Sequence, residues 1–174
     1  MDDKFRNRYR IESNRLKGWD YSSRGAYFVT VCVKDKIECF GRIENGVMKY
    51  SKIGLIVQDL WLEIPNHFSN SELDDFVIMP DHVHGIINMK YDCRDAINRV
   101  CTDNGGITGK FNMMPVVSIA RIVRWFKGRC SYELRNKKIN FYWLPRYYDR
   151  IIRNEDELNR IREYIRDNPK NWKK

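Results

Sequence analysis

The chain has 174 residues, of which 43% are hydrophobic and 32% are charged with both signs mixed. That composition supplies a core for one domain and excludes wholesale disorder. The net charge of +9 and the aromatic content of 13% favour an anionic partner such as nucleic acid, although a basic enzyme of another kind has the same balance.

The cysteines and the amino terminus indicate the compartment. The five cysteines are odd in number and form no Cys-x-x-Cys pair, so we expect reduced thiols and neither a disulfide framework nor a zinc knuckle. The first residues are charged throughout, unlike a signal peptide or membrane anchor. No apolar run approaches the roughly 18–20 residues of a spanning helix. We therefore expect a soluble, cytoplasmic protein with no membrane contact.

The chain divides into an arm and one domain. Residues 1–25 are basic and polar and predict an amino-terminal arm. Residues 26–174 predict a single folded domain. Within it, the polar, glycine-containing stretch 90–115 predicts a long variable loop.

The first elements of the domain are strands. Residues 26–33 (AYFVTVCV) are β-branched and aromatic, which predicts a central strand. A short strand over 38–43 and a return strand over 47–50 flank Asn45-Gly46, a hairpin signal.

A helix and two further strands follow. Ser51 begins a helix that runs to about residue 64, with apolar residues at helical spacing, and Pro65 ends it. The stretches 73–79 and 82–89 predict strands joined by a tight link at Pro80-Asp81.

The last third predicts a helix, a strand and a helix. Ser118 caps a helix over 118–135 whose course Gly128 and Arg129 interrupt, and 139–144 (INFYWL) predicts a strand. Asn154, with Glu157 three residues on in a capping-box variant, begins a final helix that ends at Asn168 before Pro169. This order predicts an α+β sandwich with a mainly antiparallel sheet and helices packed on it, close to a ferredoxin-like or RRM-like arrangement.

Two of the three histidines stand in one predicted strand. His82 and His84 point to the same face because strand side chains alternate. Two neutral imidazoles so placed suit one divalent metal, but they are equally compatible with two half-buried histidines of a sheet. A metal would need a third ligand. His67 is one candidate, although its polar surroundings predict a surface residue.

The final helix carries Tyr164 and Asn168 on one line, at the edge of its apolar stripe. Taken singly, each is most simply a packing residue and a helix end. A phenol oxygen is also a competent nucleophile when activated, and an Asn oxygen is a hard ligand suited to Mg²⁺ or Mn²⁺. If this helix crosses the strand of His82 and His84, Asn168 could complete a metal site beside Tyr164.

At this point the sequence resembles a known family, the REP-associated tyrosine transposases within the single-tyrosine HUH class of insertion-sequence transposases. Residues 25–41 resemble the first strands of that family. Residues 72–88 (ELDDFVIMPDHVHGIIN) resemble its His-hydrophobic-His core, and 151–172 resemble its tyrosine helix. The loop 90–115 matches poorly.

The resemblance implies an HUH endonuclease architecture and a metal-dependent endonuclease and strand transferase that cuts single-stranded DNA near hairpins. It implies that Tyr164 is the nucleophile and stays bound to the 5′ phosphate. His82 and His84 would be ligands of Mg²⁺ or Mn²⁺, and Asn168 fits the polar ligand one turn after the tyrosine. The wider class includes dimers, so a monomer and a homodimer both stay open.

One region departs from the family. Members often carry Trp-Gln-Arg before a Tyr-Tyr pair and a His soon after, whereas this chain has Leu144, Pro145 and Arg150 at the Gln, Arg and His positions. We interpret this region as DNA-facing or structural, and we therefore expect altered recognition and not lost chemistry. Tyr147 and Tyr148 are rival nucleophiles but lack a partner ligand at helical spacing.

Basic clusters with nearby aromatic residues predict the DNA-binding surface. They lie in the arm and in the helix over 118–135, although such charges can also merely face water. The predicted contacts are Arg6, Arg8, Arg10, Arg15, Lys17, Trp19, Arg121, Arg124, Trp125, Lys127 and Arg129.

Two alternatives to the transferase stay open. The first is a domesticated protein that binds hairpin DNA or RNA without cutting. The second is a nuclease that activates water, which needs a carboxylate-rich site, and Asp81 is the only acid adjacent to the histidine pair.

Overall fold

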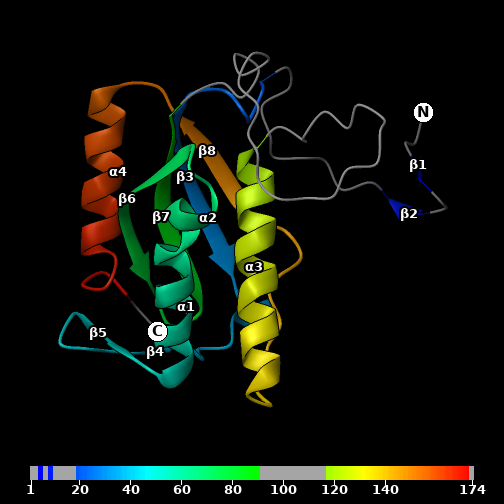
Figure 1. Ribbon diagram of the computed structural model, residues 1–174. Coiled ribbons are helices and arrows are strands. Elements are labelled where there is room, and N and C mark those ends of the chain that lie inside the picture. Colours follow the sequence, from blue (N-terminus) through cyan, green and yellow to red (C-terminus); the bar gives the residue numbers. More distant parts are fainter. Residues whose placement is uncertain (1–3, 6–7, 10–18, 91–116, 173–174) are drawn as a thin grey trace.

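The computed structural model describes residues 4–5, 8–9, 19–90 and 117–172 (Figure 1). Most of the predicted arm and of the predicted loop 90–115 lie outside the described residues. In the arm, β1 (Lys4–Phe5) pairs antiparallel with β2 (Arg8–Tyr9), which contains one predicted DNA contact, Arg8. The remaining predicted basic contacts of the arm lie outside the described residues: Arg6, Arg10, Arg15 and Lys17.

The centre of the fold is a four-stranded antiparallel sheet with the order β6-β7-β3-β8. Its strands are β3 (Gly25–Cys32), β6 (Ser71–Ile78), β7 (His82–Met89) and β8 (Tyr148–Ile152). Helices separate β3 from β6 and β7 from β8, so the chain follows the β-α-β-β-α-β order of a ferredoxin-like fold. The predicted α+β class and three of the predicted strands are confirmed.

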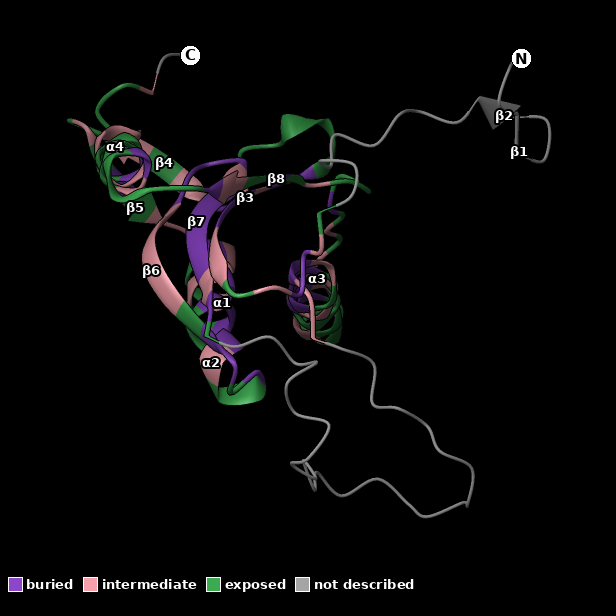
Figure 2. Ribbon diagram, turned by 90° about the horizontal axis from the view of Figure 1, so that it is seen from above, coloured by how far each residue is buried: buried purple, intermediate pink, exposed green. Residues whose placement is uncertain are grey.

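Helices cover both faces of this sheet (Figures 1 and 2). One face packs against α1 (Lys52–Leu62), the short α2 (Ile64–His67) and α3 (Ile119–Asn136). The other face packs against α4 (Glu155–Asp167) alone. Among the described residues, no helix is long and apolar enough to cross a membrane.

The alternation of side chains along the strands divides the core in two. On β3, the odd-numbered residues Tyr27, Val29 and Val31 join the large cluster beneath α1 and α3. Phe28 joins a smaller cluster with Ile86 and Ile165 beneath α4. On β7, Val83 and Ile87 belong to the large cluster, so the even-numbered His82 and His84 lie on the α4 face.

The predicted hairpin is present. β4 (Gly41–Glu44) pairs with β5 (Val47–Tyr50) through Asn45 and Gly46, which have φ of 52° and 75°. Both positive values fit the turn that Asn-Gly favours. The first strand begins three residues later than predicted.

The predicted strand over 139–144 is wrong. The segment contributes one isolated bridge, Trp143 to Val33, and the edge strand is β8 instead. Phe141 and Trp143 pack against Phe40 in the core, so their aromatic character reflects burial and not a ladder. Strand β8 was missed because its sequence YDRII has a buried Asp and exposed neighbours, which hides the apolar alternation.

Three details of the helices also differ from the prediction. Helix α3 is continuous through Gly128, because that position is exposed and a side chain there would meet nothing within 4 Å. Pro65 does not end α1 but stands in the first turn of α2, where a missing N–H costs nothing. Ser118 occupies the N-cap of α3 without a side-chain hydrogen bond, whereas the Ser51 and Asn154 caps are formed as predicted.

A pair of glycine substitutions tests how tightly β7 packs on α1. An ideal Cβ on Gly85 would lie 2.3 Å from Cζ2 of the fully buried Trp61. We expect Gly85→Ala to lower the free energy of unfolding by about 1–3 kcal/mol because of this overlap. Gly128→Ala, in open space on a helix, should raise it by about 0.5–1 kcal/mol. Urea denaturation measures both, and equal effects would contradict the close approach.

Candidate active site

The two histidines of β7 converge on the α4 face. Their Nε2 atoms lie 2.9 Å apart. The Nδ1 of His82 donates a hydrogen bond to the carboxylate of Asp81, which can only accept one when ionised. The Nδ1 of His84 lies 2.8 Å from Oγ1 of Thr30, its cross-strand partner on β3. In the tautomer with a proton on each Nδ1, which the Thr30 hydroxyl oxygen can accept from His84, both Nε2 lone pairs point to the same place.

Burial keeps His84 neutral. The side chain is buried beneath Phe28, whose ring stacks on it at 5.3 Å. Desolvation, and to a lesser extent neighbouring His82, lower the pKa of His84 to about 3. The imidazole is therefore an uncharged electron-pair donor at neutral pH, which is the form that binds metals.

Helix α4 brings a tyrosine to this pair. The hydroxyl of Tyr164 lies 3.3 Å from Nε2 of His84, and its ring meets Phe28 edge-on at 6.1 Å. Tyr164 is nevertheless 52% exposed, so a large substrate can reach its oxygen. The structure thus brings together three of the four predicted site residues.

Ion pairs fix α4 in this position. Arg162 donates Nε to Oδ1 of Asp74 at 3.0 Å and a second nitrogen to Oδ2 at 2.7 Å. Arg166 pairs with neighbouring Asp75 at 2.7 Å. At the start of the helix, Asn154 accepts from the Glu157 N–H, and the Glu157 carboxylate accepts from the Arg153 N–H, which completes the predicted capping-box variant.

The end of α4 runs along the histidines. Tyr164 contacts His84, and the ring of Trp172 lies 5.8 Å from that of His82. Asn168, half-buried and still helical, stands midway between these contacts in the chain. Among the described residues, no third His, Cys, Asp or Glu completes a ligand group. Asn168 therefore stays the predicted third ligand.

The residues fit a divalent cation. Two nitrogens bound at about 2.1 Å to one ion at a right angle lie about 3 Å apart, close to the 2.9 Å between the two Nε2 atoms. Asp81 and Thr30 hold the opposite ring nitrogens, as groups behind metal-bound histidines commonly do. Sequence reasoning missed Thr30, which contacts His84 Nδ1, and Phe28, which stacks on the His84 ring. Their positions opposite β7 depend on strand register, which the sequence of one strand does not reveal.

The other histidine and the rival tyrosines are placed differently. His67 is exposed on α2, on the opposite side of the sheet, and stacks on Trp125 at 4.5 Å. Tyr147 packs against the large core. Tyr148 lies on the α4 face with its ring 6.4 Å from Phe28, whereas Tyr164 contacts His84 itself.

Comparison with curated proteins identifies a relative of this chain. An uncharacterised protein of Haemophilus influenzae is 38% identical over 165 residues, which are 92% of this chain and 88% of that protein. The chain belongs to the same family as this protein. No family model matches the chain.

Solved structures show the fold. The REP-associated tyrosine transposase bound to a REP hairpin superposes with a TM-score of 0.58 at 16% identity, over 91% of this chain and 73% of that one. The resemblance inferred from the sequence is thus confirmed at the level of fold. A candidate transposase from Deinococcus radiodurans superposes more loosely, with a TM-score of 0.45 at 17% identity over 88% of this chain and 95% of that one.

The predicted DNA contacts of α3 lie on the face opposite Tyr164 (Figure 2). Arg121 and Arg124 are exposed there, and Arg129 pairs with Glu133 at 3.0 Å. Lys127 donates to the carbonyl oxygens of Leu144 and Pro145. The structure does not bring these residues to the histidine pair.

The two aromatic residues among the predicted contacts have partners of their own. Trp125 is half-buried, stacked on His67 and edge-on to Phe68. Trp19 is 41% exposed and donates from Nε1 to the Tyr27 hydroxyl at 3.2 Å. Both therefore have packing roles, and base stacking by them stays a prediction.

The clamp on α4 has a testable pH dependence. We expect Arg162→Ala to lower the free energy of unfolding by about 1–3 kcal/mol at neutral pH. The variant removes the two charge-assisted hydrogen bonds to Asp74, together with exposed bonds to Glu155 and Asn159. The Arg162 hydrogen bond lowers the pKa of Asp74 below 3.8. The contribution is therefore complete above pH 3.8 and is lost as the pH falls through the lower folded value.

Urea denaturation over a pH series measures this effect. Arg160→Ala is the matched control, because Arg160 is exposed on the same helix and bonds only the Asp156 carbonyl. It should change stability by less than about 0.5 kcal/mol. A difference between wild type and Arg162→Ala that persists in acid would contradict the role of Asp74.

Proposed function

We propose that this protein is a metal-dependent endonuclease and strand transferase that cuts single-stranded DNA near hairpins through a covalent phosphotyrosine at Tyr164. One observation carries the proposal: the Tyr164 hydroxyl lies 3.3 Å from Nε2 of His84, which converges on Nε2 of His82. A nucleophile beside a ligand pair of this kind suits phosphoryl transfer.

The chemistry balances without a cofactor that supplies energy. The Tyr164 oxygen forms a bond to phosphorus and its proton goes to solvent, which the half-exposed side chain allows. The bond between phosphorus and the 3′ oxygen breaks, and that oxygen takes a proton. The 5′ phosphate stays on Tyr164, so attack by another 3′ hydroxyl restores a phosphodiester and frees the tyrosine.

A divalent ion would be held by His82, His84 and Asn168. Mg²⁺ or Mn²⁺ bound there would polarise the phosphodiester and neutralise its charge. The neutral state of His84 and the position of Asn168 at the C-cap of α4, between Tyr164, which contacts His84, and Trp172, which contacts His82, support this ligand set. The Asp81 carboxylate accepts from His82, so it is occupied in orienting a ligand.

That role of Asp81 weakens the alternative of a nuclease that activates water, since such a site needs a free carboxylate as base. The transposase of the same fold is bound to a REP hairpin, and the charge of +9 on this chain suits a DNA partner. That the protein acts as a monomer or a homodimer stays a prediction.

Covalent capture tests the nucleophile. Labelled single-stranded hairpin DNA from the flanks of the protein's own gene, incubated with the protein and Mn²⁺ or Mg²⁺, should give a band of protein-linked DNA on a denaturing gel. Tyr164→Phe should abolish that band, because the attacking oxygen is gone while the ring contact with Phe28 is kept.

Tyr148→Phe and Tyr147→Phe are the matched controls, and both should still form the adduct. An adduct that survives Tyr164→Phe would refute the assignment of the nucleophile. Tight binding on native gels with no adduct from wild type would favour the alternative of a hairpin-binding protein that does not cut.

Calorimetric titration with Mn²⁺ tests the ligands. We expect His84→Ala to abolish measurable binding and Asn168→Ala to weaken it, while Asn168→Asp retains it because a carboxylate is also a hard oxygen ligand. His67→Ala, on the other side of the sheet, should bind like wild type. Wild-type affinity in Asn168→Ala would remove Asn168 from the ligand set.

A further inference from the structure

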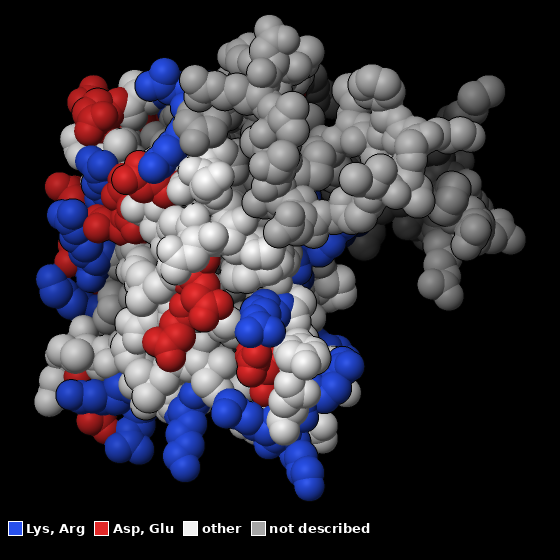
Figure 3. All heavy atoms as spheres, viewed as in Figure 1, with Lys and Arg blue, Asp and Glu red and all other residues white. Residues whose placement is uncertain are grey.

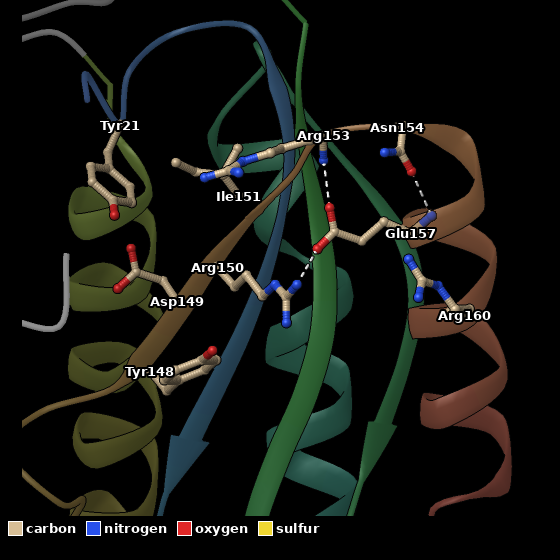
Figure 4. A pocket seen from close by; sticks show the side chains of 9 residues that line it. All are labelled: Tyr21, Tyr148, Asp149, Arg150, Ile151, Arg153, Asn154, Glu157 and Arg160. Carbon is tan, nitrogen blue, oxygen red and sulfur yellow. Dashed lines mark hydrogen bonds and ion pairs between the residues drawn. The ribbon is translucent and has the colours of Figure 1, made fainter. Parts of the chain in front are cut away.

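A pocket of about 470 Å³ opens at the edge of the sheet, where β8 passes into α4 (Figure 4). Strand β8 is the outer strand, so the pocket lies between the α3 side and the α4 side of the molecule. Tyr148, Arg150, Arg153 and Arg160 line it. Tyr148 and Arg150 belong to the stretch for which the sequence predicted altered recognition, whereas Arg153 and Arg160 were not among the predicted DNA contacts.

Of the three arginines that line this pocket, Arg150 is paired, whereas Arg153 and Arg160 are available to bind an anion. Arg150 pairs with Glu157 at 2.6 Å, and the same carboxylate accepts from the Arg153 N–H at 2.9 Å. These bonds hold the pKa of Glu157 below its usual value, with the Arg153 N–H as the largest cause. Within the described part of the chain, the exposed Arg153 and Arg160 guanidinium groups form no ion pair within 4 Å, although the Arg153 charge also contributes to the lowered pKa of Glu157.

The other acid of the pocket does not oppose them. Asp149 is buried and, by strand alternation, lies on the side of β8 away from Arg150. Figure 4 shows its carboxylate beside Tyr21, while Arg160 comes from α4 at the other end of the pocket. The open side of the pocket is therefore cationic and suits phosphate groups.

An aromatic path joins the pocket to the active site. The ring of Tyr148, 44% exposed, lies 6.4 Å from that of Phe28. Phe28 in turn stacks on His84 and meets Tyr164 edge-on. One ring thus separates the pocket from the catalytic pair, and an exposed tyrosine can stack on a DNA base of any sequence.

We propose that this pocket binds the unpaired DNA strand next to the cleaved bond, with Arg153 and Arg160 on its phosphates and Tyr148 against a base. The strand would cross the β8 edge and reach Tyr164 over Phe28. The inference rests on the proposed function, because it names where the substrate of that reaction lies.

Binding without cleavage tests the pocket. In a Tyr164→Phe background, fluorescence anisotropy would follow two probes over a salt series: a labelled hairpin with an unpaired oligothymidine extension and the same hairpin without it. For the extended probe, Arg153→Gln combined with Arg160→Gln should reduce the slope of log affinity against log salt by about 0.7 for each phosphate that the variant no longer neutralises. The blunt hairpin should show little change.

The control removes the same charge elsewhere. Arg135→Gln with Lys137→Gln changes two exposed cations at the far end of α3 and should leave both slopes as they are. Tyr148→Ala should weaken binding of the extended probe about fivefold or more, and Tyr148→Phe should not, because the ring is kept. Unchanged slopes in the arginine variant, or equal effects on both probes, would overturn the inference.

The two proposals fail in different ways. If wild type forms no adduct but the pocket variants bind the extended probe selectively more weakly, the cleavage reaction is refuted, and the pocket is a binding site for unpaired DNA without a cleaved bond beside it. If the adduct forms while the pocket variants bind normally, the strand path is refuted and the cleavage reaction stands.

Discussion

The antiparallel pairing of β3 with β7 is the constraint on which the site depends. It sets Thr30 opposite His84 and thereby supplies the hydrogen bond to Nδ1. It also places Phe28 so that its ring stacks on His84. A shift of one residue in this register would turn both histidines into the core beneath α1 and α3. The fully buried odd-numbered residues Val29, Val31 and Val83 make such a shift costly, so the core fixes the chemistry.

The two faces of the sheet differ in how apolar they are. The α1 and α3 face carries the large apolar cluster, with Trp61 packed against Gly85 and Phe126. The α4 face is only partly apolar. Beside its small apolar cluster it carries the imidazoles of His82 and His84 and the exposed Tyr148 and Tyr164. Figure 3 shows acids and bases alternating along the edge formed by α4, and basic side chains projecting where α3 ends. Stability is thus concentrated on one face, which leaves the other free to hold polar groups.

The sequence predicted the parts of this arrangement that depend on local patterns. The same-face placement of His82 and His84 followed from the period of two, and the Asn154 cap from its own spacing to Glu157. What it could not supply was pairing. Thr30, Phe28 and Asp74 reach the site through strand register and helix docking, which are properties of the folded chain. Burial also explains where local patterns misled. Phe141 and Trp143 fill the core beside Phe40, which made an irregular segment resemble a strand, while the buried Asp149 hid β8 for the opposite reason.

The attachment of α4 rests on a smaller apolar cluster than that of α1 and α3, and this helix carries the proposed nucleophile. Its apolar contact is small, with Ile165 fully buried and Leu158 and Ile161 only partly so. Ion pairs to Asp74 and Asp75 on β6 add to this contact, and the Arg162–Asp74 pair is the more buried of the two. Regions with few buried contacts open at lower free energy than the core does. Since α4 carries Tyr164, such an opening would separate the tyrosine from His84 while the sheet stays folded, and a displacement of about 1 Å already costs reaction rate severely. The ion pairs of α4 with β6 therefore position Tyr164 in the proposed active site as the strand register positions the histidines.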